Sequence, residues 1–123
     1  MAAKQLFQYF FNSPLQRDTV QALRETTGMR IREVGNPLED TPGRGRFANG
    51  ASMYLTRLEP EGTWAIEAFT HTPDELDIGA AAAMRSSLRR LLGRIADNWE
   101  EPYVDPALLA ADAAQESGAA EGG

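Results

Sequence analysis

The chain has 123 residues, enough for one domain with a modest core of two packed layers. It contains no cysteine, which excludes disulfides, thiolate metal sites and a cysteine nucleophile. Its formal net charge of −6 is uneven, because residues 1–96 carry all twelve basic residues and eleven acidic ones, whereas residues 97–123 carry seven acidic residues and no basic one. No apolar run reaches the roughly 18 residues that cross a bilayer, so we expect a cytoplasmic protein that does not enter a membrane.

The first part of the chain predicts a strand, a helix and a second strand. The aromatic run from Leu6 to Phe11 is typical of a strand buried on both faces. In "SPLQ", Ser13 fits the N-cap of a helix that we expect from Pro14 to Thr27, with Gly28 as its stop. The alternation in "MRIREV" then indicates a half-buried strand.

Residues 35–50 read "GNPLEDTPGRGRFANG", a composition that favours neither helix nor strand. A loop this long in a compact domain is usually functional or disordered. Within it, Arg44 and Arg46 offer guanidinium groups to an anion, and Phe47 offers a ring for stacking. The segment lacks the Gly-Lys-Ser/Thr of a P-loop, so we expect a solvated loop that is also the best single place for contact with a partner.

The second part predicts a β-hairpin, a long helix and a tail. The runs "SMYLTRL" and "TWAIEAFTH" alternate in polarity and are joined by "EPEG". From Pro73 to about Trp99, apolar residues recur at three- and four-residue steps, the pattern of a helix with one buried face. Alanine, glycine and acidic residues then dominate, and we expect residues 101–123 to be a largely disordered acidic tail.

This order of elements predicts a single α+β domain over residues 1–100. We expect two layers, an antiparallel sheet of about four strands in the chain order β-α-β-β-β-α, and both helices on one face. Two positions remain possible for the first strand: it lies centrally in the sheet, or it pairs with its copy across a homodimer.

The only histidine, His71, stands just before three acidic residues and suggests a catalytic or metal site. Helix initiation explains the acidic residues equally well, because Thr72 and Glu75 fit a capping box and the others favour the positive end of the helix dipole. A lone histidine without a second histidine or a cysteine makes a poor zinc site. We therefore expect no catalytic residue, metal ligand or cofactor, and contact with a partner as the role of His71.

Four arginines of the long helix flank its apolar stripe: Arg85, Arg89, Arg90 and Arg94. Side chains in such positions run along the core and keep their charge in water. We expect the acidic tail to pack loosely against them.

Strand alternation places six side chains on the sheet face away from the helices: Arg30, Arg32, Tyr54, Thr56, Glu67 and Phe69. Arg and Tyr carry much of the binding energy at protein interfaces, which favours a binding face. The alternatives are an ordinary polar face or a face covered by the first strand or the tail.

The leading interpretation is a protein-binding module of the immunity-protein, secretion-chaperone or regulator type. It would act through this face and the 35–50 loop. The expected protein-binding residues are Arg30, Arg32, Arg44, Arg46, Phe47, Tyr54, Glu67, Phe69 and His71.

Two other functions stay open. One is a small-ligand protein or minor enzyme with a pocket between sheet and helices near Tyr54, Trp64 and His71, although the chain lacks an evident set of nucleophile, base and acid. The other is nucleic-acid binding, because a helix, three strands and a helix is also the order of double-stranded-RNA-binding domains, and "AAAAMRSSLRRLL" is similar to their last helix. Those domains open that helix with a lysine-rich phosphate clamp, whereas this chain reads "TPDELD", so nucleic acid is the least favoured partner.

Overall fold

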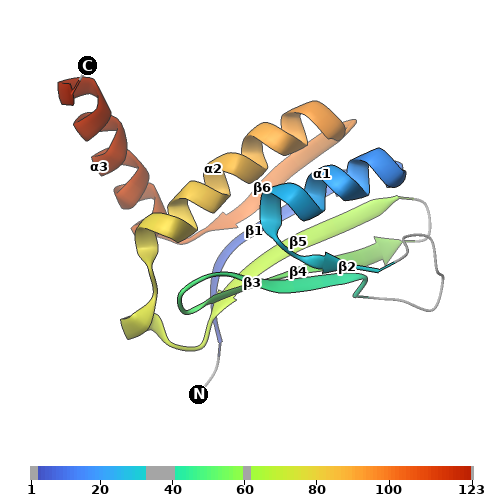
Figure 1. Ribbon diagram of the computed structural model, residues 1–123, viewed down its shortest axis with the longest axis horizontal. Helices are drawn as coiled ribbons and strands as arrows, with labels where there is room; N and C mark the ends of the chain where they lie inside the picture. Colours follow the sequence, from blue (N-terminus) through green and yellow to red (C-terminus); the bar gives the residue numbers. More distant parts are fainter. Residues whose placement is uncertain (1–2, 33–40, 60–61, 123) are drawn as a thin grey trace.

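Six strands form one sheet in the computed structural model, which describes residues 3–32, 41–59 and 62–122 (Figure 1). They are β1 (Lys4–Asn12), β2 (Arg30–Ile31), β3 (Gly43–Ala48), β4 (Ala51–Glu59), β5 (Thr63–Thr70) and β6 (Asn98–Val104). Their spatial order is β2-β3-β4-β5-β1-β6, and every neighbouring pair is antiparallel. The first strand thus takes the more central of the two places considered for it, between β5 and β6.

The helices form the second layer. They are α1 (Arg17–Thr27), α2 (Ile78–Ile95) and α3 (Pro106–Gly122), and a short 3₁₀ helix, η1 (Pro73–Glu75), precedes α2. Figure 1 shows α1 and α2 side by side over one face of the sheet, while α3 packs against α2 and projects from the end of this layer. The predicted α+β class and antiparallel sheet are confirmed. No helix of the described residues is long and apolar enough to span a membrane.

The core lies between the sheet and the α1–α2 layer. Alternate residues of β1 supply its aromatic part, because Phe7, Tyr9 and Phe11 are fully buried on the side of the helices. The helices add aliphatic side chains such as Leu23 of α1 and Leu88 of α2, both without exposed surface. Among the described residues, no helix covers the opposite face of the sheet.

The expected number of about four strands was wrong because two segments form strands that their composition did not indicate. Within the 35–50 segment, residues 35–40 lie outside the described part, but Gly43–Ala48 is strand β3. Its glycines face the helices: a Cβ on Gly45 would lie 3.1 Å from the Met29 Cα, and one on Gly43 would lie 3.0 Å from the Ile31 Cγ1. Glycine stands here because the chain from Met29 to Ile31 packs tightly against β3, and not because the backbone turns.

The second unexpected strand is β6, which begins where we expected the long helix to end and the tail to start. The region expected to be disordered instead continues through β6 into α3. Asp105 starts this helix, since its Oδ1 accepts a hydrogen bond of 2.9 Å from the Ala107 backbone N–H, and Leu108 is fully buried. Because β6 crosses position 100 within the same sheet, the fold does not end there.

Both predicted helix caps, Ser13 and Thr72, were wrong. Helix α1 begins at Arg17, and the Ser13 hydroxyl instead donates to the Ile95 carbonyl at 3.2 Å. Helix α2 begins at Ile78, where the Asp77 carboxylate accepts from the Ala80 N–H at 3.0 Å. The predicted glycine stop of α1 is confirmed, because the residue after Thr27 has φ of 71° in the left-handed region.

Candidate functional site

The sheet face opposite the helices carries no helix in the described part of the chain (Figure 1). Cross-strand pairing aligns six of its side chains in a row that crosses the whole sheet. From β2 to β6 they are Arg30, Arg44, Tyr54, Glu67, Gln8 and Tyr103, which we call the open-face row. Both ends of the row are exposed and its middle is half-buried, so a partner can reach it along its length.

A second set of side chains lies beside this row. Arg46 of β3 is paired with Ser52 of β4, and Ser52 is paired with Phe69 of β5. The Phe69 ring packs edge-on against the Tyr54 ring, with 6.0 Å between their centroids. The structure therefore brings six of the nine expected binding residues onto one face: Arg30, Arg44, Arg46, Tyr54, Glu67 and Phe69.

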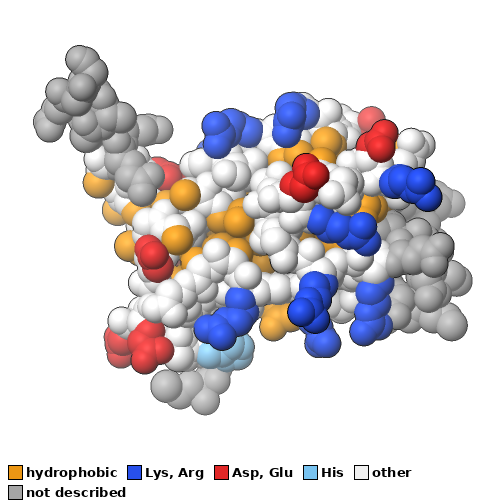
Figure 2. Space-filling model, in the orientation of Figure 1, with side chains coloured by type: hydrophobic (Ala, Val, Ile, Leu, Met, Phe, Trp, Pro, Cys, Tyr) orange, Lys and Arg blue, Asp and Glu red, His pale blue; other side chains and the backbone are white. Residues whose placement is uncertain are grey.

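Three arginines, Arg30, Arg44 and Arg46, crowd the β2–β3 end of this face, and we call them the arginine triad. Arg30 and Arg44 are directly paired across two strands, and Arg46 follows two positions later on the same face. None of the three forms an ion pair with another described residue. Figure 2 shows Lys and Arg side chains in a row over β2 and β3 with no acidic side chain between them. Like charges opposite each other destabilise a sheet, so the triad does not serve stability.

The acidic member of the open-face row is Glu67, and it already has a partner. It accepts a hydrogen bond of 2.8 Å from the Gln8 Nε2 and stays half-buried. Its position opposite Tyr54 separates it from Arg44 by one strand. The face is thus basic at the β2–β3 end and polar in its middle.

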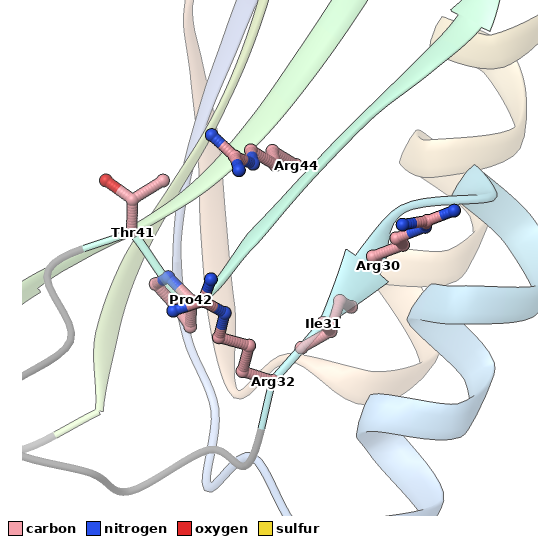
Figure 3. Close-up of a pocket in the computed structure, with 6 residues that line it drawn as sticks. All are labelled: Arg30, Ile31, Arg32, Thr41, Pro42 and Arg44. Atoms are coloured by element: carbon pink, nitrogen blue, oxygen red, sulfur yellow. The ribbon is translucent and has the colours of Figure 1, made fainter.

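The arginine triad borders two neighbouring pockets. The larger one, of about 440 Å³, is lined by Arg30, Ile31, Arg32, Thr41, Pro42 and Arg44 (Figure 3). The smaller one, of about 270 Å³, is lined by Arg30, Arg44, Gly45, Arg46, Ser52 and Tyr54. Figure 3 shows the guanidinium groups of Arg30, Arg32 and Arg44 spread around the larger pocket instead of converging on one point. This arrangement fits several negative charges in a line better than one small anion.

Two of the residues singled out from the sequence face the core instead. Phe47 lies at a bulge in β3 and packs against Phe7, with 6.1 Å between ring centroids. Trp64 is buried on the helix side of β5, and its Nε1 donates to the Ser13 carbonyl at 3.2 Å. Since Trp64 and Tyr54 lie on opposite faces of the sheet, the pocket expected between Tyr54, Trp64 and His71 does not form.

His71 directly follows β5 and is exposed. Within the described residues it makes no hydrogen bond or ion pair. Of its acidic neighbours, Asp74 and Glu75 lie on η1, and Asp77 is the N-cap of α2. The same residues contain no group of three or more His, Cys, Asp and Glu side chains that could hold a metal ion. The contact with a partner expected for His71 stays a prediction.

A buried charged cluster, which the sequence analysis did not predict, joins α2 to β1, β6 and α3. Arg85 donates two hydrogen bonds of 2.9 Å to the Glu101 carboxylate and one of 2.6 Å to Asp112. The Tyr9 hydroxyl donates to the same Glu101 carboxylate. Arg85 is only 4 % exposed, so the contact expected between the tail acids and the helix arginines exists here, but it is buried and specific instead of loose.

The protonation states of this cluster are fixed by its contacts. Hydrogen bonding to Glu101 raises the pKa of Arg85 against the opposing effect of burial. Burial by itself raises the pKa of Glu101, yet the hydrogen bonds from Arg85 and Tyr9 outweigh it and hold this pKa below its ordinary value. Burial, reinforced by Glu101, raises the pKa of Tyr9 far above its ordinary value. None of these groups is therefore poised to exchange a proton near neutral pH, and the cluster acts as a brace.

Helical spacing could have revealed Arg85 from the sequence. It stands four residues after Ala81 and three before Leu88, and both of these are buried. That spacing puts Arg85 inside the apolar face of α2 and not beside it, which calls for a buried acidic partner. Its acidic partners come from the segment expected to be disordered, so they could not be predicted from the sequence.

A scan of the chain against protein-family models finds no match, and neither do searches of curated proteins and of solved structures.

Proposed function

We propose that this chain is a protein-binding module that holds its partner on the helix-free face of its sheet. The observation that carries the proposal is the exposed arginine triad, without an ion pair among the described residues, beside the Tyr54–Phe69 ring pair. Arginine and tyrosine are the side chains that most often dominate the binding energy of protein interfaces. A face that concentrates them at the expense of sheet stability is best explained by a partner that covers it.

The size of the face supports this function. The open-face row spans six strands, and with about 4.8 Å between strands it is about 24 Å long. A partner in a stable complex typically contributes about 800 Å², a patch about 28 Å on a side. Leu58 of β4 and Tyr103 of β6 add exposed apolar surface, since they are 48 % and 37 % exposed. One face of this sheet is therefore large enough for a specific protein complex.

The proposal includes the class of module. An immunity protein, a secretion chaperone and a regulator each use a small rigid domain to occupy another protein, and this chain offers a braced fold with one helix-free face. We place it in the cytoplasm, where a fold held together without disulfides is the rule.

The test compares two double variants with the same change in charge. Arg44→Glu with Arg46→Glu reverses the triad, whereas Arg90→Glu with Arg94→Glu reverses two exposed arginines on α2. Each tagged protein is expressed in its native host and purified gently, and native mass spectrometry measures what remains bound. We expect the wild type and the α2 variant to carry a protein at fixed stoichiometry and the triad variant to lose it. Thermal unfolding checks that both variants stay folded.

Three results would contradict the proposal. A partner retained equally by all three proteins would bind elsewhere on the molecule. A second copy of the chain, lost from the triad variant, would make the face a homodimer interface. A retained small molecule without protein would favour the second candidate function below.

A small anionic ligand is the second candidate, because the pocket beside Arg30 and Arg44 has a volume of about 440 Å³. Ligand pockets typically measure about 300–1,000 Å³ but are largely apolar and enclose their ligand. This pocket is instead lined by three arginines and lies at the sheet edge (Figure 3). Isothermal titration with inorganic phosphate and with citrate tests it directly, and saturable micromolar binding to either would support it.

A further inference from the structure

The arginine triad has a spacing that selects the shape of its partner. Arg44 and Arg46 lie two residues apart on β3, so their Cα atoms are separated by about 6.6 Å. Arg30 is paired with Arg44 from the neighbouring strand, about 5 Å away. The triad therefore forms a short line along β3 with one further positive charge beside it.

An extended polypeptide segment has the same spacing between alternate residues as Arg44 and Arg46. In an extended segment, side chains at alternate positions point to one side and are also about 6.6 Å apart. Two carboxylates at positions i and i+2 of such a segment can each face one guanidinium group, and an arginine fork accepts a carboxylate through two parallel hydrogen bonds. Strand alternation puts Gly45, between the two arginines, on the core side, so no side chain of β3 interrupts the line on this face.

The neighbouring strands support the same occupant. The shallow pocket of about 270 Å³ lies between Arg44, Arg46 and Tyr54, and it leaves room for a chain that runs along β3. The Tyr54 and Phe69 rings stand next to it and can pack against an apolar side chain of the same segment. The guanidinium groups near the larger pocket are spread apart (Figure 3), which disfavours a single compact anion.

We infer that the triad is a receptor for an extended segment of the partner protein that carries acidic side chains at alternate positions and lies along β3. This inference rests on the proposed function and names the chemistry of its partner. The acidic side chains neutralise charges that oppose each other in the free protein, so binding also relieves the repulsion between Arg30 and Arg44.

The experiment uses synthetic peptides as probes on the full-length protein. One peptide alternates Glu and Ser, a second has the same composition with its Glu residues in one block, and a third places Glu at i and i+4 in an alanine-rich helix. Binding is followed by NMR titration of the backbone amides. We expect the alternating peptide to bind about fivefold tighter than the block peptide, the gain from roughly one added charge pair, with the largest shifts at Arg44, Arg46 and Tyr54.

The variants and outcomes separate this inference from the proposed function. Arg44→Glu with Arg46→Glu should abolish the preference, whereas Arg90→Glu with Arg94→Glu should keep it. Equal binding of the alternating and block peptides, or tighter binding of the helical one, overturns the inference. If the native partner is still lost from the triad variant in that case, the proposed function stands without it. If the triad variant keeps the native partner, the proposed function itself fails.

Discussion

Arg85 and Glu101 form a bidentate ion pair that joins α2 to β6, with Nε donating to Oε2 and Nη2 to Oε1 at 2.9 Å each. The remaining Arg85 nitrogen, Nη1, reaches Asp112 of α3 at 2.6 Å. One guanidinium group therefore holds the last strand and the last helix against the helix layer. The sheet edge at β6 is fixed by this contact, and with it the far end of the open face.

Replacing Arg85 by methionine should destabilise the protein by about 3 kcal/mol, the lower end of the range for breaking a buried pair, because it leaves two half-buried carboxylates without their counter-charge. Urea denaturation at neutral pH measures this change. Arg94→Met is the matched control on an exposed turn of the same helix, with an expected effect within about 0.5 kcal/mol. A loss below about 1 kcal/mol for Arg85→Met, the usual size for a surface pair, would show that the cluster does not brace the fold.

The cluster should also make stability depend on pH in the acid range. The pKa of Glu101 in the folded protein lies below its ordinary value of 4.5, so the unfolded chain takes up the proton first as the pH falls. The stabilisation is therefore complete above about pH 4.5 and is lost as the pH falls through the lower pKa of the folded state. We expect Glu101→Gln to be less stable at neutral pH and to lose less stability on acidification.

Urea denaturation at a series of pH values measures this dependence. Glu100→Gln alters the neighbouring carboxylate, which is exposed and paired with Phe10 on the opposite face. This variant should keep the wild-type dependence of the free energy of unfolding on pH. The same dependence for both variants would exclude Glu101 as its source.

The elements that local rules define were predictable from the sequence. Helical periodicity and the glycine after Thr27 gave α1, and alternation on both sides of a tight turn gave the hairpin of β4 and β5. Alternation also placed Arg30, Tyr54 and Phe69 on the face away from the helices, as the register shows. These features depend only on residues close in sequence.

The elements that depend on distant contacts were not predictable. Gly43 and Gly45 resembled the glycines that break helices and strands, because the atoms that require glycine there lie outside β3: the Ile31 side chain at Gly43 and the Met29 backbone at Gly45. Strand β6 begins within the segment expected to be helical, and it exists because β1 offers it a free edge. The grouping of the arginine triad could not be predicted for the same reason, because Arg30 lies opposite Arg44 only when β2 pairs with β3.

Alanine should have opposite effects on stability at Gly45 of β3 and at Gly93 of α2. Gly45→Ala would bring its Cβ to 3.1 Å from the Met29 Cα, a backbone atom that cannot easily move, and should destabilise the protein by about 1–3 kcal/mol. Gly93→Ala places its Cβ in open space on α2 and should stabilise the helix by about 0.5–1 kcal/mol. Thermal unfolding of both variants measures the difference, and a neutral Gly45→Ala would mean that the α1–β2 connection does not press on β3.

The docking of α3 gives the last prediction. Leu108 has no exposed surface, whereas Leu109 next to it is 46 % exposed. Leu108→Ala should therefore cost about 2–5 kcal/mol through lost burial and a cavity, and Leu109→Ala should stay within about 0.5 kcal/mol. The loss should be similar at low and high salt, because packing of apolar surface is not screened as surface charge pairs are. Urea denaturation of both variants measures it, and equally small effects would mean that residues 106–122 do not pack on the domain and that the acidic tail expected from composition is correct.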